Sequence, residues 1–177
     1  MALLTPKRPG AALVLADGRI FHGRSAGAAG LTSGETVFNT AMTGYQEILT
    51  DPSYTGQLVT LTTAHVGNTG WNAEDMECGK IAAAGLIVNR MTDVPSNWRA
   101  TESLTDHLKA TGIVAITDLD TRALTMHLRT TGAQPGAIIA AAEGELTDAD
   151  IEQAKTAAQS WGVMVGQDLA KTVTVDA

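Results

Sequence analysis

The sequence predicts an α/β domain whose sheet is mixed, with both antiparallel and parallel strand pairs. Asp17-Gly18 separates two apolar runs and is typical of a tight β-hairpin, which pairs its strands antiparallel. After residue 80, strand-like and helix-like runs alternate, which favours parallel pairs joined by helical crossovers. With 177 residues the chain has the size of one domain, able to bury roughly 70% of its unfolded surface.

The chain begins with a tail and the hairpin. Residues 1–9 contain two prolines and a Lys-Arg pair, which predicts a loose N-terminal tail. The hairpin strands are predicted at 11–16 and 19–25, joined by a two-residue loop in which Gly18 tolerates a positive φ.

A run of spaced glycines follows the hairpin. It has neither the GKS or GKT ending of a P-loop nor the GxGxxG pattern of a dinucleotide-binding helix. We therefore interpret it as a flexible connector and not as a nucleotide site. The glycines are Gly23, Gly27, Gly30 and Gly34.

The stretch from 35 to 70 compresses several elements into a short length. β-Branched residues alternate with polar ones at 35–40 and again at 57–62, which predicts two strands. A polar loop follows the second strand at 64–70.

Between these strands the sequence predicts a short helix and a fixed bend. Tyr45, Ile48 and Leu49 fall at helical spacing, and Thr43 is the predicted N-cap. Pro52 stops the helix, because the residue before a proline avoids the helical region. Such a bend between two strands is suited to presenting polar groups to a ligand or partner.

The second half alternates strands and helices. Thr101 and Asp120 are predicted N-caps, and Thr147 with Asp150 forms a variant of the capping box. Strands are predicted at 81–88, 113–117 and 137–141. Helices are predicted at 102–111, from 120 to Gly132, and from Thr147 onward. The last helix carries an apolar stripe of Ile151, Ala154, Ala158 and Trp161.

Composition limits the kinds of partner. The chain carries 12 basic and 19 acidic residues and a net charge of -7, whereas proteins that bind a phosphate backbone concentrate Lys and Arg. No apolar run approaches the ~20 residues of a membrane span, and the first residues do not resemble a signal peptide. We therefore predict a cytoplasmic protein that binds neither nucleic acid nor membrane.

Residues with catalytic chemistry are scattered. Cys78 lies among acidic residues, which disfavour the thiolate that a nucleophile needs. The histidines show no HExxH spacing, and there is no second cysteine, so no metal site and no cofactor are predicted. The histidines are His22, His65, His107 and His127.

Two pairs of residues are possible sites. Ser53 and His65 are close enough in sequence for a Ser/His pair, but no GxSxG surrounds Ser53, and a turn hydroxyl is the favoured interpretation. Asp118 and Asp120 could be magnesium ligands, although Asp120 is better explained as a helix cap.

The tryptophans in predicted loops are the other candidates. Trp71 and Trp98 could anchor an interface, or either could merely cover the core. Taken together, these residues and motifs do not form a complete active site.

The stretch from 35 to 70 resembles a known family. It reads GETVFNTAMTGYQEILTDPSYTGQLVTLTTAHVGNTG and is similar to the N-terminal domain of the small, glutamine-dependent subunit of carbamoyl-phosphate synthase. The resemblance continues through Ser96-Asn97-Trp98-Arg99, SLTDHLK at 103–109, ITDLDTRAL at 116–124, GAQPGAI at 132–138 and QDLAKTV at 167–173.

The resemblance implies a fold and a partner. The fold is a layered β/β/α domain. In the family the small subunit releases ammonia from glutamine, and the large subunit uses it to make carbamoyl phosphate for arginine and pyrimidine synthesis. The expected organisation is a tail at 1–9, the N-terminal domain at 10–160, and at 161–177 the end of that domain and the start of a linker to an absent class I glutamine amidotransferase domain.

The resemblance also implies a site. The serine of the DPSY bend contributes to the family's glutamine site and corresponds to Ser53. No residue corresponds to the amidotransferase triad, so the chain alone is expected to be inactive. The implied partners are the large subunit, the amidotransferase domain and glutamine.

Two alternatives stay open at this point. One is a freestanding binding or regulatory module derived from this domain, for which Ala41 and Met126 would be permissive departures from the family pattern. The other is an independent hydrolase that uses Ser53 and His65, which the missing GxSxG disfavours.

Overall fold

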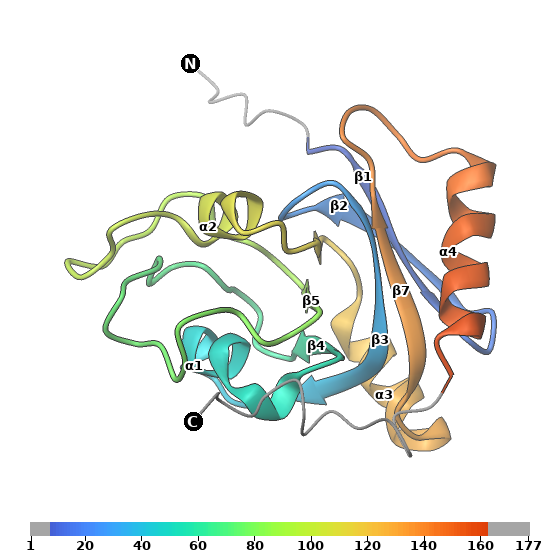
Figure 1. Ribbon diagram of the computed structural model, residues 1–177, viewed down its shortest axis with the longest axis horizontal. Coiled ribbons are helices and arrows are strands. Elements are labelled where there is room, and N and C mark those ends of the chain that lie inside the picture. The colour runs from blue at the N-terminus through green and yellow to red at the C-terminus, as the bar shows by residue number, and fades with distance from the viewer. Residues whose placement is uncertain (1–7, 163–177) are drawn as a thin grey trace, which may run out of the picture.

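The computed structural model describes residues 8–162, and within them seven strands form one mixed sheet that closes into a barrel in the order β1-β2-β6-β5-β4-β3-β7 (Figure 1). The strands are β1 (Gly10–Leu15), β2 (Ile20–Ser25), β3 (Gly30–Asn39), β4 (Gln57–Leu61), β5 (Gly85–Val88), β6 (Ala115–Thr117) and β7 (Gln134–Ala140). The helices are α1 (Tyr45–Thr50), the 3-10 helix η1 (Pro52–Tyr54), α2 (Leu104–Ala110), α3 (Thr121–Thr131) and α4 (Asp148–Ser160). None of the helices in this part of the chain is long and apolar enough to cross a membrane.

The mixed pairing confirms the predicted α/β class. β1 pairs antiparallel with β2, whereas β3, β4, β5 and β6 form consecutive parallel pairs. The last crossover was expected to be parallel, and that expectation is wrong, because β7 runs antiparallel to both β1 and β3. Leu124 and Leu128 of α3 pack into the barrel interior, so α3 closes one end of the barrel instead of crossing a sheet face.

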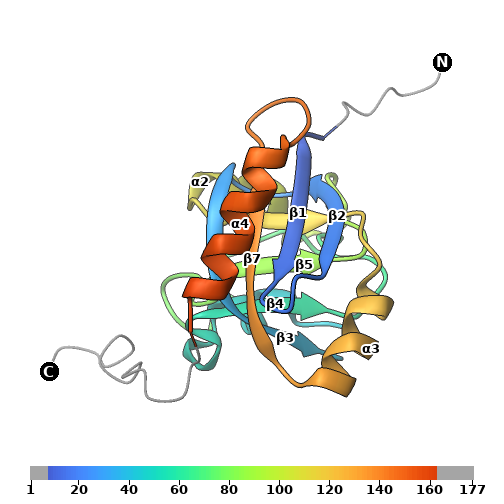
Figure 2. The same cartoon turned by 90° about the vertical axis from the view of Figure 1, so that its right-hand side faces the viewer.

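The apolar residues form three layers of packing around the sheet. Alternate residues of β1 and β7 point into the barrel or outward under α4, which lies across β1 and β7 in Figure 2. On the opposite side α1, α2 and long loops cover the outer faces of β4 and β5. Strands buried on both faces explain why β1 and β5 are continuous apolar runs.

The hairpin forms as predicted but with a longer turn. The Leu15 amide donates to the Arg19 carbonyl at 2.9 Å, which leaves three residues in the loop instead of two. Gly18 has φ +90°, as expected from its place in the turn.

The glycines after the hairpin do not form a flexible connector. β3 starts at Gly30, five residues before the predicted strand, and pairs with β7 from its first residue. A Cβ at Gly27 would lie 2.3 Å from the Ile113 carbonyl oxygen, and one at Gly34 would lie 2.5 Å from that of Gly56. Glycine is needed at these positions because the backbones approach so closely.

The predicted N-caps of α3 and α4 are confirmed, whereas those of α1 and α2 are wrong. Asp120 accepts a hydrogen bond from the Ala123 amide at 2.9 Å, and Thr147 with Asp150 forms a complete capping box. The N-cap of α1 is the left-handed Gly44, not Thr43.

The cap of α2 was also misplaced by sequence. Ser103 accepts from the Asp106 amide at 3.0 Å and is the N-cap. Thr101 instead donates its hydroxyl to the Trp71 carbonyl at 2.9 Å.

Several strand ends differ from prediction. Residues 81–84 precede β5 as a loop whose Ala82 and Ala83 amides donate to the Leu49 carbonyl of α1. β7 begins at Gln134, three residues before the predicted start of that strand.

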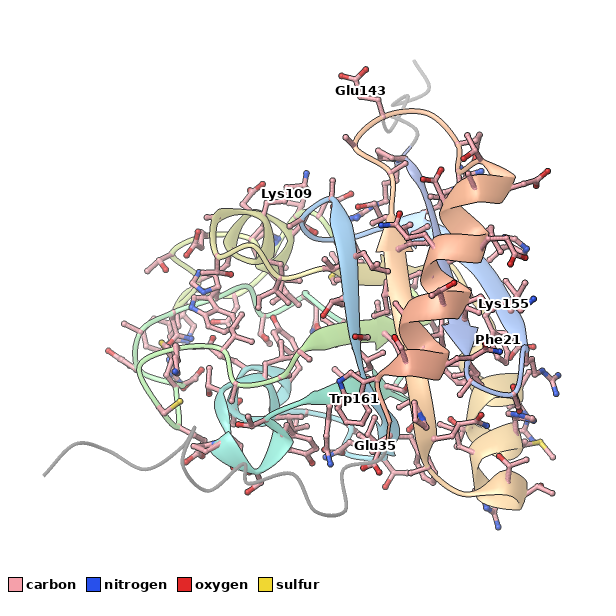
Figure 3. The ribbon with its side chains drawn as sticks, turned by 45° about the vertical axis from the view of Figure 1, so that its right-hand side comes forward. Phe21, Glu35, Lys109, Glu143, Lys155 and Trp161 are labelled. Atoms are coloured by element: carbon pink, nitrogen blue, oxygen red, sulfur yellow. The ribbon has the colours of Figure 1, made fainter. Side chains whose placement is uncertain are left out.

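The apolar stripe predicted on α4 is buried at Ala154 and Ala158 and half-buried at Trp161, which lies with Glu35 at the lower end of the molecule in Figure 3. The expectations for 1–7 and 163–177 lie outside the described residues.

Candidate functional site

The bend predicted around Pro52 is a well-defined turn between α1 and β4. Asp51 adopts an extended conformation, with φ -71° and ψ 120°, as expected for a residue before proline, and this ends α1. Pro52 then opens the 3-10 helix η1, where its missing amide hydrogen costs nothing. The local sequence thus fixes where the helix stops and where the turn begins.

Side chains as well as backbone groups hold the turn. The Asp51 carboxylate accepts the Ser53 amide at 2.8 Å, and the Pro52 carbonyl accepts the Thr55 hydroxyl at 2.8 Å. Tyr54 anchors the turn to the sheet, because its hydroxyl accepts a hydrogen bond from the Asn39 side chain at 2.8 Å at the end of β3.

Ser53 is the residue that this arrangement presents to solvent. Its backbone amide is occupied by Asp51, its side chain is exposed, and its hydroxyl forms no hydrogen bond within residues 8–162. Ser53 thus lies in the expected turn, but its hydroxyl does not bond nearby backbone, and the Asp51 carboxylate makes the side-chain bond of the turn instead. A hydroxyl on a rigid turn is available to a ligand as donor or acceptor.

Ser53 and His65 do not form a catalytic pair. No hydrogen bond joins them in the described part of the chain, and His65 instead lines a cavity of about 60 Å³ with Met42, Tyr45 and Thr69. A cavity of this size holds only a few water molecules. The Ser/His hydrolase alternative has no geometric support.

α1 fastens the long loop that follows β4. Tyr45 donates its hydroxyl to the Gly70 carbonyl at 2.5 Å, and burial raises the pKa of the Tyr45 hydroxyl. The Gln46 side chain bonds both the amide and the carbonyl of Asn72. Sequence reasoning missed these positioning residues. No sequence signal marks Gln46, because its burial and its distant partner Asn72 are seen only in the structure.

The other catalytic candidates have structural roles. Cys78 donates its thiol to the Thr50 carbonyl at 2.9 Å. His107 stacks on Trp71 with ring centroids 3.9 Å apart and bonds Glu102. The remaining histidines are an exposed His22 on β2 and a His127 that bonds Asp17.

The Asp118 and Asp120 pair is explained by the backbone. Asp120 caps α3, and exposed Asp118 takes a left-handed φ of +61°. Within residues 8–162 no group of three or more His, Cys, Asp or Glu side chains is placed to hold a metal ion.

The two loop tryptophans have opposite environments. Trp71 is 3% exposed and belongs to the core, whereas Trp98 is 91% exposed. Of the two suggested interface anchors, only Trp98 is available to a partner.

Comparison with known proteins identifies the family. The family model for the carbamoyl-phosphate synthase small chain, CPSase domain, matches residues 13–138. The chain belongs to the carbamoyl-phosphate synthase small-chain family. This confirms the resemblance found in the 35–70 stretch and in the motifs beyond it.

Curated relatives agree with this assignment. The carbamoyl phosphate synthase small chain of Neisseria gonorrhoeae is 57% identical over 164 residues, which cover 93% of this chain and 42% of the relative. That of Xanthomonas axonopodis pv. citri is 54% identical over 166 residues, 94% of this chain and 41% of the relative. That of Rubrivivax gelatinosus is 52% identical over 175 residues, which cover 98% of this chain and 46% of the relative. The chain thus spans less than half the length of these small chains.

Proposed function

We propose that this chain acts as the N-terminal domain of the small subunit of glutamine-hydrolysing carbamoyl-phosphate synthase. It docks on the large subunit and supports the glutaminase domain, which supplies ammonia for carbamoyl phosphate synthesis. The observation that carries the proposal is identity above 50% to small chains over more than nine tenths of this chain. The match to the family model, over residues 13–138, includes the turn at Ser53.

In this proposal the Ser53 turn contributes to the glutamine site at the junction with the amidotransferase domain. Support comes from the geometry of the turn, because Asp51 occupies the Ser53 amide and leaves an exposed hydroxyl for hydrogen bonding. Glutamine carries amide, ammonium and carboxylate groups, and a serine hydroxyl can both donate to and accept from such groups. Ser53 binds or orients substrate in this role and takes no part in bond cleavage.

The experiment compares two nitrogen sources in the reconstituted enzyme. Ser53→Ala should lower carbamoyl phosphate formation from glutamine while leaving formation from ammonia near wild type, because ammonia bypasses the glutamine site. One lost hydrogen bond of about 1 kcal/mol corresponds to a change in kcat/KM of about fivefold. Equal effects on both nitrogen sources, or no effect on either, would remove Ser53 from the glutamine site.

A further inference from the structure

The loop before α2 exposes two large apolar side chains on one short segment. Within the loop at 93–100, here called the Trp98 loop, Trp98 is 91% and Val94 is 77% exposed. Isolated apolar side chains on a surface are ordinary, but two within five residues, one of them tryptophan, are not. Tryptophan is also the residue type most enriched among the side chains that dominate binding energy at interfaces.

The loop is held in place along its length, so its exposure is not that of a loose segment. The Ser96 amide donates to the Asn68 carbonyl at 2.9 Å, and the Arg99 amide donates to the Asn97 side chain at 2.8 Å. Directly after the loop, the amide of Thr101 bonds the Trp71 carbonyl at 2.9 Å.

Ion pairs fix both ends of the loop. Asp93 pairs with Arg8, and Arg99 pairs with Asp75 and Glu74. Gly70 makes the close fit possible, since a Cβ there would lie 2.6 Å from that of Ala100. An anchor that is ordered before binding loses little conformational entropy on association.

The Trp98 loop and the Ser53 turn lie at different edges of the molecule. In Figure 1 the loop extends to the left of α2, whereas α4 lies at the right and the turn after α1 lies at the lower edge. Trp161, near the end of the described residues, is also at the lower end in Figure 3. The proposed function brings the amidotransferase domain to the Ser53 turn, which lies at a different edge of the molecule from the Trp98 loop.

The charges around Trp98 indicate what kind of partner surface would bind the loop. Arg99 is paired with both Glu74 and Asp75, which leaves an excess negative charge beside Trp98. The chain as a whole carries -7. A matching surface therefore has an apolar pocket with basic residues at its rim.

We propose that the Trp98 loop is the face of this domain that docks into the large subunit, with Trp98 as the anchor in an apolar pocket rimmed by Lys or Arg. This inference rests on the proposed function, because it names the face used by the same partner. It assigns the loop a role that the Ser53 turn does not share.

The test measures the dissociation constant between this chain and its cognate large subunit by isothermal titration calorimetry. Trp98→Ala should weaken binding by about 30-fold or more, the loss expected of a dominant interface side chain. Met126→Ala is the matched control, because Met126 is 57% exposed on α3 and lies outside the loop. It should change binding less than twofold.

A loss of binding in Trp98→Ala should not come from a loss of folding. Trp98 is nearly fully exposed, so Trp98→Ala should keep the thermal midpoint and circular dichroism of the parent chain. Val94→Lys is a second variant, because an added positive charge opposes both the apolar pocket and its basic rim without touching the core, and it should also weaken binding.

The outcomes separate this inference from the proposed function. If the parent chain binds and Trp98→Ala binds equally well, the docking face lies elsewhere and only this inference fails. If the parent chain does not bind the large subunit at micromolar concentration, the proposed function fails and the inference with it. If Trp98→Ala instead converts a dimer of this chain to a monomer, the loop serves self-association, and the inference is overturned.

Discussion

The Ser53 amide donates a hydrogen bond to the Asp51 carboxylate at 2.8 Å, and this bond holds the backbone of the turn that carries the exposed Ser53 hydroxyl. Asp51 thus supports the backbone at Ser53, while the Ser53 hydroxyl is the group available to a ligand. This relationship separates a positioning residue from a contact residue, and the two can be tested independently.

Asp51→Ala should loosen the turn and reduce glutamine use. Loss of a capping acceptor costs about 1 kcal/mol of stability. Loss of the bond to the Ser53 amide should loosen the turn that carries the Ser53 hydroxyl, so the KM for glutamine should rise while ammonia-dependent activity stays near that of the parent. Asp51→Asn keeps an acceptor oxygen and should lie between the variant and the parent. Steady-state kinetics measures the KM for glutamine, and urea unfolding measures the loss of stability. A normal KM in Asp51→Ala would mean that the turn does not need this bond.

Gly34→Ala tests the close packing of β3. Its Cβ would meet the Gly56 carbonyl oxygen at 2.5 Å, so we expect a loss of about 1–3 kcal/mol in the free energy of unfolding. Gly79→Ala is the control, because nothing lies within 4 Å of its Cβ position. Similar urea midpoints for the two variants would restore the idea of a flexible connector.

Ala154→Leu tests the layer between α4 and the sheet. Ala154 is fully buried against Ala12 and Ala137, so the extra atoms should force α4 outward at a cost of about 1–3 kcal/mol. Gln159→Leu, on the exposed side of α4, should leave stability within about 0.5 kcal/mol. Urea unfolding followed by circular dichroism compares them, and equal stabilities would indicate a loosely packed helix.

Asp17 links stability to pH at the hairpin turn. Burial by itself would raise the pKa of Asp17, but hydrogen bonds from the Arg19 amide and the His127 ring outweigh it and hold the pKa below 3.8. A lowered folded-state pKa stabilises the protein above the unfolded-state value of about 3.9, and this stability is lost as the pH falls through the folded-state pKa.

Asp17→Asn should therefore be less stable than the parent at pH 5–7, and the difference should shrink as the pH falls below about 4. Urea unfolding at a series of pH values measures this difference. A difference that stays constant down to pH 2.5 would show that the charge of Asp17 plays no part.

Sequence predicted the elements whose signals are local. The cap at Asp120, the box at Thr147 and the glycine at position 18 all depend on neighbours within three residues. The antiparallel course of β7 could not be predicted in the same way, because it depends on α3 closing the barrel end. The glycines of 27–34 were wrongly predicted to form a flexible connector for a similar reason, since the carbonyls they approach come from distant segments.

The candidate site was only partly predictable. The stop before Pro52 follows from backbone sterics, so the turn at Ser53 was expected. The different exposures of Trp71 and Trp98 were not, because both lie in polar stretches and only the path of the chain decides which one is covered. The clamp between Gln46 and Asn72 spans 26 residues and leaves no sequence pattern.

The most direct test of the account is reconstitution of glutamine-dependent carbamoyl phosphate synthesis from three parts. These are this chain, the cognate large subunit and a separately expressed amidotransferase domain. The account predicts that the three parts associate, that glutamine-dependent activity needs all of them, and that omission of this chain leaves only ammonia-dependent activity. Full glutamine-dependent activity without this chain, or no association at micromolar concentration, would contradict it.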